Sequence, residues 1–570
     1  MQNMARKLLL REIKNLKWER KLSTSAVFRN DDFIIKSTIP DIVVPKQRFI
    51  DRMWAKSAGY KNHVAIESAE TKKNYTYAQL EKNTSAFATS LVKKFGLKPG
   101  DVVAVMLPNC PEFPVVAFGC LQAGCVLTTV NPIYKEFELV HQTTITEPKV
   151  FVTLPECYDT VTKSLKAAKL QCKIVLVDNP NNAVPDGVTR YSEVAELGEP
   201  DYGLLDKITR RGDDLACIPF SSGTTGLPKG VEITFDNLMA GIEVMQQKET
   251  CFPNVTNGDF QEVLPAFLPF FHIYGLVIGL MGHLSLGCKQ VTMAKFSASS
   301  YLDILKTQKT TLLYIVPPVA ILLGKHPDVN ETHYRHVRHI ICGAAPLAAS
   351  DVEAILQKSK HAIEFNQGFG MTETTSLGTS TFKGTKNVNF NACGVPMASV
   401  QMKFADPSTE QAVPIGQSGE LYIRSPTVMR GYHKNPKATE ESMTKDGFFK
   451  TGDMGYFQPG VGLFITDRIK ELIKVKGMQV APAELESLLR SHPAVADAAV
   501  IGVPHEFFGE VPKAFIIRKN GLKISEEEIQ DFVASKVAVY KKIEEVMFVD
   551  EIPKTASGKI LRKELRKMYA

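Results

Sequence analysis

Short apolar runs alternate with longer amphipathic segments along most of this 570-residue chain. From about residue 31 onward the segments between the runs, such as 77–95, repeat their apolar residues with the period of a helix. The clearest runs are 101–107, 149–154, 173–177, 291–293, 311–316 and 339–342. Short apolar strands between helices predict stacked α/β layers built on a largely parallel sheet.

The pattern changes after residue 416, where short strands with Gly and Pro turns, such as 419–424, replace the earlier alternation. A charged segment at 467–476 then precedes a final compact stretch. A chain of this length is expected to form at least two domains. We therefore predict an α/β fold with a large N-terminal domain over 31–467, which includes a β-rich subdomain, and a small α+β C-terminal domain over 468–570.

Composition describes a globular protein, with 44% hydrophobic and 23% charged residues. Of the net charge of +7, residues 1–30 carry +6, from eight basic residues and two glutamates. The rest of the chain is nearly neutral, which argues against nucleic acid as a partner. The ten cysteines form no CxxC pair, so neither a disulfide framework nor a zinc site is expected.

Residues 1–30 form a basic, amphipathic head in which Leu9, Ile13 and Leu16 share one helical face. A Ser-rich stretch follows, and together they resemble a mitochondrial presequence. A basic surface helix on a cytoplasmic protein is the alternative. The C-terminal Lys-Met-Tyr-Ala differs from the peroxisomal Ser-Lys-Leu signal.

The apolar stretch 263–281 is long enough to raise the question of a membrane span. Because Pro265, Pro269 and His272 interrupt it, we predict a buried strand, a loop and a helix instead. Peripheral membrane contact stays open, as does the choice between a monomer and a homodimer.

A Gly, Ser and Thr-rich segment at 221–230 is the first motif that points to chemistry. Its glycines allow the backbone to approach phosphate oxygens, and Lys229 adds a positive charge. It is not a Walker A loop, because Pro228 precedes the lysine and Gly230 follows it. A flexible linker would have a similar composition, so this segment alone leaves both interpretations open.

Further motifs follow in order along the chain, and together they resemble those of the adenylate-forming superfamily of acyl-CoA synthetases, 4-coumarate–CoA ligases and luciferases. Besides 221–230, they are 268–272, 343–346, 367–373, 451–453, 467–470, 473–474, 476–479 and 553–559. The resemblance covers nearly the whole chain after the head. It is closest to the branch of 4-coumarate–CoA ligases and luciferases.

The resemblance implies a nucleotide site that binds ATP with Mg²⁺. The residues implied in holding the phosphates are Ser221, Ser222, Gly223, Thr224, Thr225, Gly226 and Lys229. Glu373 and Thr225 would hold the Mg²⁺, Thr372 would lie beside the α-phosphate, and Asp453 and Arg468 would bind the ribose. The residues implied around the adenine are Gly343, Ala344, Ala345, Pro346, Gln367, Gly368, Phe369, Gly370 and Met371.

The resemblance also implies two half-reactions, in which a carboxylic acid becomes an acyl-AMP and the acyl group then passes to coenzyme A. Lys559 would lie between the attacking carboxylate and the α-phosphate as a positioned cation. The small C-terminal domain would then rotate about a hinge at Lys470. After rotation Lys474, Gly477 and Gln479 would face the site.

His272 would lie beside the acyl carboxylate, although a histidine in so apolar a run is also typical of a packed core. The candidate walls of the acyl pocket are Ile273, Tyr274, Ile278, Gly343 and Ala344. The bulk of Ile278 favours an apolar acid, which leaves medium- or long-chain fatty acids and cinnamate-like acids as candidates.

Three positions depart from the family pattern: Phe235, Phe369 and Phe448 replace residues that are usually polar or larger. Each phenylalanine keeps a bulky side chain at its position, so we expect altered ligand affinity rather than lost catalysis. Two alternative functions stay open. One is adenylation with a different acceptor or a luciferase-like oxidation, and the other is a non-catalytic nucleotide-binding scaffold.

Overall fold

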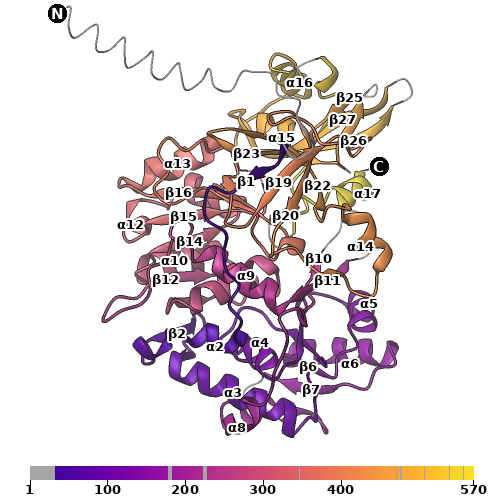
Figure 1. Cartoon of the computed structure of the whole chain (residues 1–570). Helices are drawn as coiled ribbons and strands as arrows, with labels where there is room; N and C mark the ends of the chain where they lie inside the picture. The colour runs from indigo at the N-terminus through magenta and orange to yellow at the C-terminus, as the bar shows by residue number, and fades with distance from the viewer. Residues whose placement is uncertain are drawn as a thin grey trace, which may run out of the picture.

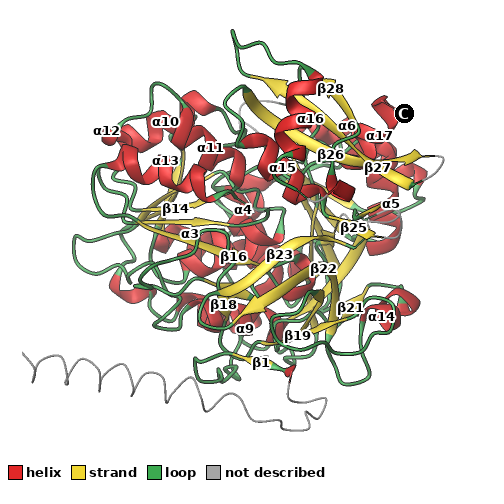
Figure 2. Ribbon diagram, turned by 90° about the horizontal axis from the view of Figure 1, so that it is seen from above, coloured by secondary structure: helices red, strands yellow, loops and turns green. Residues whose placement is uncertain are grey.

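The fold is that of a computed structural model, which describes residues 33–177, 183–221, 228–345, 347–469, 471–475, 478–505, 508–537, 539–555 and 558–569. The side chains at 474, 478, 479 and 509 lie outside this description. Most of the chain forms one large body, and the C-terminal elements lie together at one end of it (Figures 1 and 2).

The first layer of the large body is a sheet with the strand order β10-β11-β9-β5-β4-β6-β7-β8, in which β21 also pairs with β11. The strands from β5 to β8 along this order are parallel, as the apolar runs predicted. Their bounds are β4 Val102–Met106, β5 Val126–Thr129, β6 Val150–Thr153, β7 Lys173–Leu176, β8 Thr189–Arg190, β9 Leu215–Cys217, β10 Phe220–Ser221, β11 Lys229–Thr234 and β21 Gly431–Tyr432.

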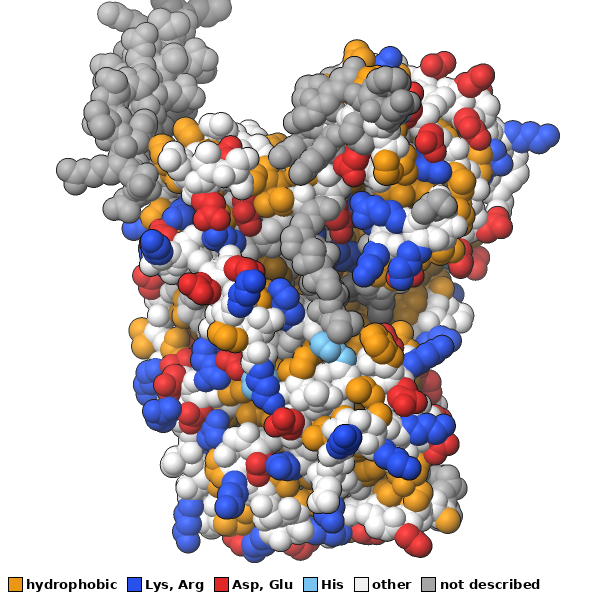
Figure 3. Space-filling model, turned by 90° about the vertical axis from the view of Figure 1, so that its right-hand side faces the viewer, with side chains coloured by type: hydrophobic (Ala, Val, Ile, Leu, Met, Phe, Trp, Pro, Cys, Tyr) orange, Lys and Arg blue, Asp and Glu red, His pale blue; other side chains and the backbone are white. Residues whose placement is uncertain are grey.

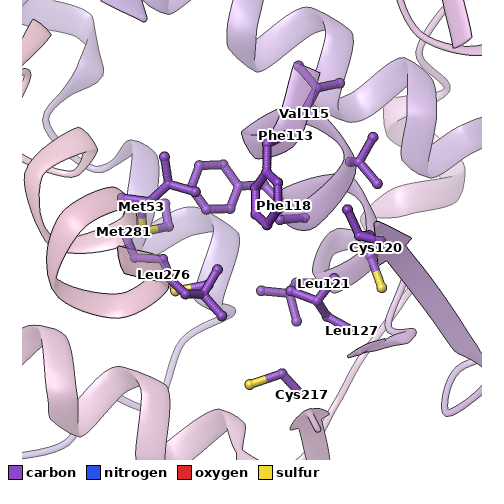
Figure 4. Packing of buried hydrophobic residues seen from close by; sticks show 14 of the residues in the cluster. Met53, Phe113, Val115, Phe118, Cys120, Leu121, Leu127, Cys217, Leu276 and Met281 are labelled. Atoms are coloured by element: carbon purple, nitrogen blue, oxygen red, sulfur yellow. The ribbon is translucent and has the colours of Figure 1, made fainter. Parts of the chain in front are cut away.

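Helices flank this sheet because their apolar faces are buried when they pack against it. The helix α3 begins at a capping box in which Thr76 accepts from the backbone of Gln79 and the Gln79 side chain accepts in return. The side chains of α4 meet Met53 and two residues of a π-helix, Leu276 and Met281, in the core shown in Figure 4. The helices of this region are α2 Phe49–Trp54, α3 Tyr77–Lys93, α4 Glu112–Gln122, α5 Glu136–Thr146, α6 Tyr158–Ala167, α7 Tyr191–Val194, α8 Tyr202–Leu205 and α9 Phe235–Met245.

A second layer contains two sheets with the orders β12-β13-β2-β3 and β14-β15-β16-β17-β18. The apolar stretch at 263–281 folds here as β12, a connecting loop and all but the last residue of a π-helix, Tyr274–Gly282, as predicted. No helix of the described ranges is long and apolar enough to cross a membrane. The strands are β2 Val64–Ser68, β3 Asn74–Thr76, β12 Val263–Ala266, β13 Lys289–Thr292, β14 Leu312–Ile315, β15 His339–Cys342, β16 Glu364–Phe369, β17 Thr379–Ser380 and β18 Val395–Pro396. The helices are α10 Ala298–Thr307, α11 Pro317–Lys325, α12 Glu331–Tyr334 and α13 Ala349–Ser359.

An antiparallel sheet with the order β1-β19-β20-β22-β23 forms the β-rich part. This sheet includes strands that precede residue 416, where the sequence pattern changes. One of them is β1 near the N-terminus, which pairs with β19 through Ile35 and Met402. The strands are β1 Ile35–Lys36, β19 Gln401–Ala405, β20 Gly419–Arg424, β22 Phe449–Gln458 and β23 Gly462–Arg468, and α14 spans Pro436–Ser442.

The C-terminal elements form a separate small sheet with the order β25-β24-β27-β26, and β28 pairs with β27. Helices cover this sheet and give it its own apolar core. The strands are β24 Ile473–Val475, β25 Met478–Val480, β26 Val495–His505, β27 Gly509–Arg518 and β28 Glu545–Phe548, and the helices are α15 Pro482–Arg490, α16 Glu526–Ala534 and α17 Arg562–Tyr569. The observed layers confirm the predicted fold class.

The surface of the large body carries basic and acidic side chains interspersed over the face shown in Figure 3. This mixture agrees with the nearly neutral charge of the chain beyond its head. Among the described residues, this face shows no one-sided basic patch of the kind that binding to a phosphate backbone uses.

Candidate functional site

A cavity of about 290 Å³ lies where the carboxyl ends of β14, β15 and β16 meet the start of the π-helix. Parallel strands gather the residues that follow them at one edge, and this is where α/β proteins bind ligands. Tyr314, Gly343 and Gly370 reach the cavity from these three strands or their ends, and Lys559 reaches it from the C-terminal part. The cavity therefore lies between the large body and the small one.

A second cavity of about 180 Å³ continues from the first, because Ala344, Gly368, Gly370, Arg468 and Lys559 line both. The adjoining residues include the predicted adenine wall and ribose ligand, namely Ala345, Gln367, Phe369 and Asp453.

Position 370, in the wall of this second cavity, requires a glycine. A Cβ at this position would lie 1.4 Å from the carbonyl oxygen of Ser376. A side chain therefore cannot be accommodated without moving the backbone that lines both cavities.

The carboxylate of Asp453 faces this second cavity. One of its oxygens accepts from Arg468 Nε at 3.0 Å, because β22 and β23 place the two residues opposite each other. Among the described residues, no group donates to the buried Oδ2. Burial raises the pKa of this carboxyl, with Arg468 opposing the rise. A vicinal diol such as that of a ribose would supply the missing donors.

Tyr432, which lies outside the motifs, contacts both Glu373 and Lys229. The Tyr432 hydroxyl donates to Glu373 Oε1 at 3.1 Å, and Lys229 Nζ lies 4.6 Å from the centre of the Tyr432 ring. Pairing of β11 with β21 brings Tyr432 to this place. A nearly buried carboxylate beside a lysine suits Mg²⁺ that is shared with phosphates, since this ion usually takes one or two carboxylates and phosphate oxygens.

His272 and Lys559 both line the first cavity. Burial, helped by the charge of Lys559, lowers the pKa of His272 to about 4, so the imidazole is neutral at pH 7. Its Nδ1 accepts from the backbone N–H of Tyr274 at 3.3 Å. The proton of the neutral ring therefore lies on Nε2, where it can be donated to a carboxylate.

The lysine itself is held by a tight turn in which Thr555 Oγ1 accepts from the Lys559 N–H at 3.0 Å. Burial, and after it Arg468, lowers the pKa of Lys559 to about 8, while Glu471 and Asp453 oppose this change. Lys559 is thus a half-buried cation that faces the predicted site of two anions.

All five predicted walls of the acyl pocket line the first cavity: Ile273, Tyr274, Ile278, Gly343 and Ala344. The Tyr274 hydroxyl is buried and, within the described ranges, has no hydrogen-bond partner. The structure adds apolar walls that the motifs did not reveal, namely Met245, Phe252, Tyr314, Leu377 and Met397. These side chains lie in stretches that resemble ordinary core strands and helices, so no local signal marked them.

Of the remaining predicted residues, Ser221, Met371 and Thr372 also line the first cavity. Others lie outside the described residues: Ser222, Gly223, Thr224, Thr225, Gly226, Pro346, Lys470 and Gly477. The backbones of Lys474 and Gln479 lie opposite each other on the hairpin of β24 and β25, and their side chains are outside the description. Their roles stay predictions.

The three phenylalanine departures occupy different surroundings. Phe369 lines the second cavity, as expected for an adenine wall. Phe235 is buried at the first position of α9, and Arg210 lies 5.8 Å from its ring centre. Phe448 is fully buried between Lys403 and Arg424, which lie 4.4 and 4.5 Å from its ring centre. Phe235 and Phe448 are therefore packing residues.

Comparison with known proteins agrees with this geometry. The family described as "AMP-binding enzyme" matches residues 53–433, and its C-terminal domain matches residues 484–559. The chain is 37% identical to 4-coumarate–CoA ligase 2 of Nicotiana tabacum over 543 residues, which cover 95% of this chain and 98% of that protein. It is also 37% identical to 4-coumarate–CoA ligase of Pinus taeda, with the same coverage.

Solved structures give the same result. ATP-bound MatB from Rhodopseudomonas palustris superimposes with a TM-score of 0.81 at 29% identity, over 92% of this chain and 98% of that one. A benzoate CoA ligase from Burkholderia xenovorans shares the fold, with a TM-score of 0.80 at 24% identity over 91% of this chain and all of that one. The chain therefore belongs to the AMP-binding enzyme family.

Proposed function

We propose that this protein is an AMP-forming acid–CoA ligase that joins a carboxylic acid to coenzyme A with ATP and Mg²⁺. The observation that carries the proposal is the meeting of Lys559, His272 and Asp453 around two connected cavities, where one Asp453 oxygen has no hydrogen-bond donor among the described residues. One cavity has apolar walls for an acid, and the other has the groups that a nucleotide needs. Similarity over 95% of the chain to proteins named 4-coumarate–CoA ligases supports the same activity.

In the first half-reaction a carboxylate oxygen attacks the α-phosphorus of ATP, and pyrophosphate leaves. The attacking group and the phosphate are both anions, so the cation of Lys559 reduces their repulsion. At about 4 Å such a charge is worth on the order of 4 kcal/mol near a protein surface. Glu373 would hold the Mg²⁺ that neutralises the departing pyrophosphate, and Asp453 would fix the ribose.

In the second half-reaction the thiol of coenzyme A loses its proton to solvent, its sulfur attacks the acyl carbonyl carbon, and AMP leaves with the electron pair of the broken bond between that carbon and the AMP oxygen. Neutral His272 can donate from Nε2 to an acyl oxygen in either step. Lys559 lines the same cavity as His272, where this carbonyl would lie. The small C-terminal part must therefore move before the thiol can approach.

We further infer that the acid has an apolar tail, either a cinnamate-like ring without a hydroxyl group or a medium-length or longer alkyl chain. Ile278, Met245, Phe252 and Leu377 support this, because these four side chains form an apolar part of the pocket wall that offers no hydrogen-bonding group. The names of the relatives favour an aryl acid. The volume of the cavity is compatible with both classes.

The test is a product assay with purified protein, ATP, Mg²⁺, coenzyme A and one acid at a time. The acids are alkyl acids of increasing length, cinnamic acid and its 4-hydroxy derivative, and the products measured are AMP and acyl-CoA. Equal amounts of AMP and thioester from an apolar acid are expected. Acid-dependent pyrophosphate exchange without thioester would show that the protein adenylates an acid but transfers the acyl group to an acceptor other than coenzyme A. No exchange with any acid would contradict the proposal.

A further inference from the structure

Asp467 is a buried carboxylate at the end of β23, three residues before the predicted hinge. One of its oxygens accepts from the backbone N–H of Arg468 at 2.7 Å. The other, Oδ2, accepts from the backbone N–H of Ala483 at 3.0 Å. Ala483 is the second residue of α15, so Asp467 caps a helix that lies on the other side of the hinge.

The helix α15 needs this cap, because its own N-terminal residues supply none. Ala481 at the N-cap position has no side-chain oxygen, and Pro482 has no N–H. Ala483 therefore carries the first backbone N–H of the helix, and this N–H needs an acceptor from outside the helix. A carboxylate at this end also interacts favourably with the helix dipole.

The capped helix is linked to the catalytic lysine through ion pairs. Glu486 of α15 binds Arg562 Nη2 at 2.6 Å, and Arg562 also pairs with Glu471. Arg562 lies only three residues after Lys559. The contacts thus run from Asp467 in the large body through α15 and Arg562 to the segment that carries Lys559.

We propose that Asp467 is a positioning residue that holds the small C-terminal part in the orientation where Lys559 faces the nucleotide. The inference rests on the proposed function. The two ends of the bond to Ala483 lie on opposite sides of Lys470, so the bond must break when the small part rotates. Asp467 therefore favours the first half-reaction at the expense of the second.

Substitution by asparagine tests the charge with little change of shape. Burial raises the pKa of the Asp467 carboxyl to about 7, and Arg562 opposes that rise. Asparagine imitates the protonated form, which has lost its attraction to Arg562 and to the helix dipole. Asparagine keeps an oxygen that can accept from Ala483, so the variant loses only the negative charge at the helix N-terminus, which is worth about fivefold in an equilibrium constant.

The experiment measures the two half-reactions separately in Asp467→Asn and in the unchanged protein. Acyl-AMP formation without coenzyme A should fall about fivefold in the variant. Thioester formation from supplied acyl-AMP and coenzyme A, without ATP, should be unchanged or faster. If Asp467→Asn does not fold, Asp467→Ser keeps an oxygen acceptor without the charge, and the same selective loss is expected of it.

Ser525→Ala is the matched control. Ser525 caps α16, which also lies in the C-terminal part, by accepting from the N–H of Glu528 at 3.1 Å. This variant should lose a similar amount of thermal stability and keep both half-reactions. Equal losses in both half-reactions of Asp467→Asn, or no loss in either, would overturn the positioning role. Absence of both half-reactions in the unchanged protein would contradict the proposed function instead.

Discussion

Gly558 lies directly against Pro318 of α11, one residue before Lys559. An added Cβ would lie 2.5 Å from Pro318 Cγ and 2.6 Å from Cδ. Carbon atoms in contact are about 3.5 to 4.0 Å apart, so Gly558→Ala must push this segment about 1 Å away from α11. Because the neighbouring residue is the positioned cation, a shift of about 1 Å should lower the adenylation rate on the order of 100-fold.

A second effect of the same substitution is backbone strain. Gly558 has φ of +80°, where an alanine costs about 1 to 2 kcal/mol. Gly521 provides the matched control, since its φ is +79° and no atom lies within 4 Å of an added Cβ. Gly521→Ala therefore reports the strain alone, and the difference between the two variants reports the clash with Pro318.

The assay is acyl-AMP formation in a single turnover, followed by thioester formation from supplied acyl-AMP. Gly558→Ala should lose the first reaction and stay within about threefold of the unchanged protein in the second, because the rotated C-terminal part no longer contacts α11. If Gly558→Ala forms acyl-AMP within about threefold of Gly521→Ala, the close approach to Pro318 does not position Lys559.

The remaining predictions concern charge, the ribose, the acid and the head. The kcat/KM for adenylation should fall as the pH rises through about 8, because Lys559 loses its proton there. Lys559→Ala should remove this alkaline decrease along with most of the rate. An alkaline decrease that persists in the variant would show that another group causes it. Asp453→Asn should raise the KM for ATP on the order of tenfold, whereas an unchanged KM would remove Asp453 from the ribose site. Ile278→Ala should shift preference about tenfold toward a bulkier acid, measured as a ratio of kcat/KM values, and an unchanged ratio would place the acid elsewhere. Residues 1–30 should direct a fused fluorescent protein to mitochondria, and a diffuse cytoplasmic signal would refute the presequence.

The sequence by itself determined the fold class and, through its motifs, which residues to expect at the site. Apolar runs separated by helical periods specify buried strands between helices, because each element must hide one face. Residues of one motif, such as Gly368 and Gly370, stay close in space because they are close in the chain. Asp453 and Lys559 lie in separate motifs and were identified by the resemblance to a known family, and both line the second cavity.

The tertiary structure alone decided which distant residues complete that site. Tyr432 reaches Glu373 only through the pairing of β11 with β21, and Tyr314 becomes a pocket wall only because β14 lies beside β15. The contact of Gly558 with Pro318 depends on how two bodies dock. Local hydrophobic periodicity carries no information on strand order or on docking, since both are set by packing between residues far apart in the chain.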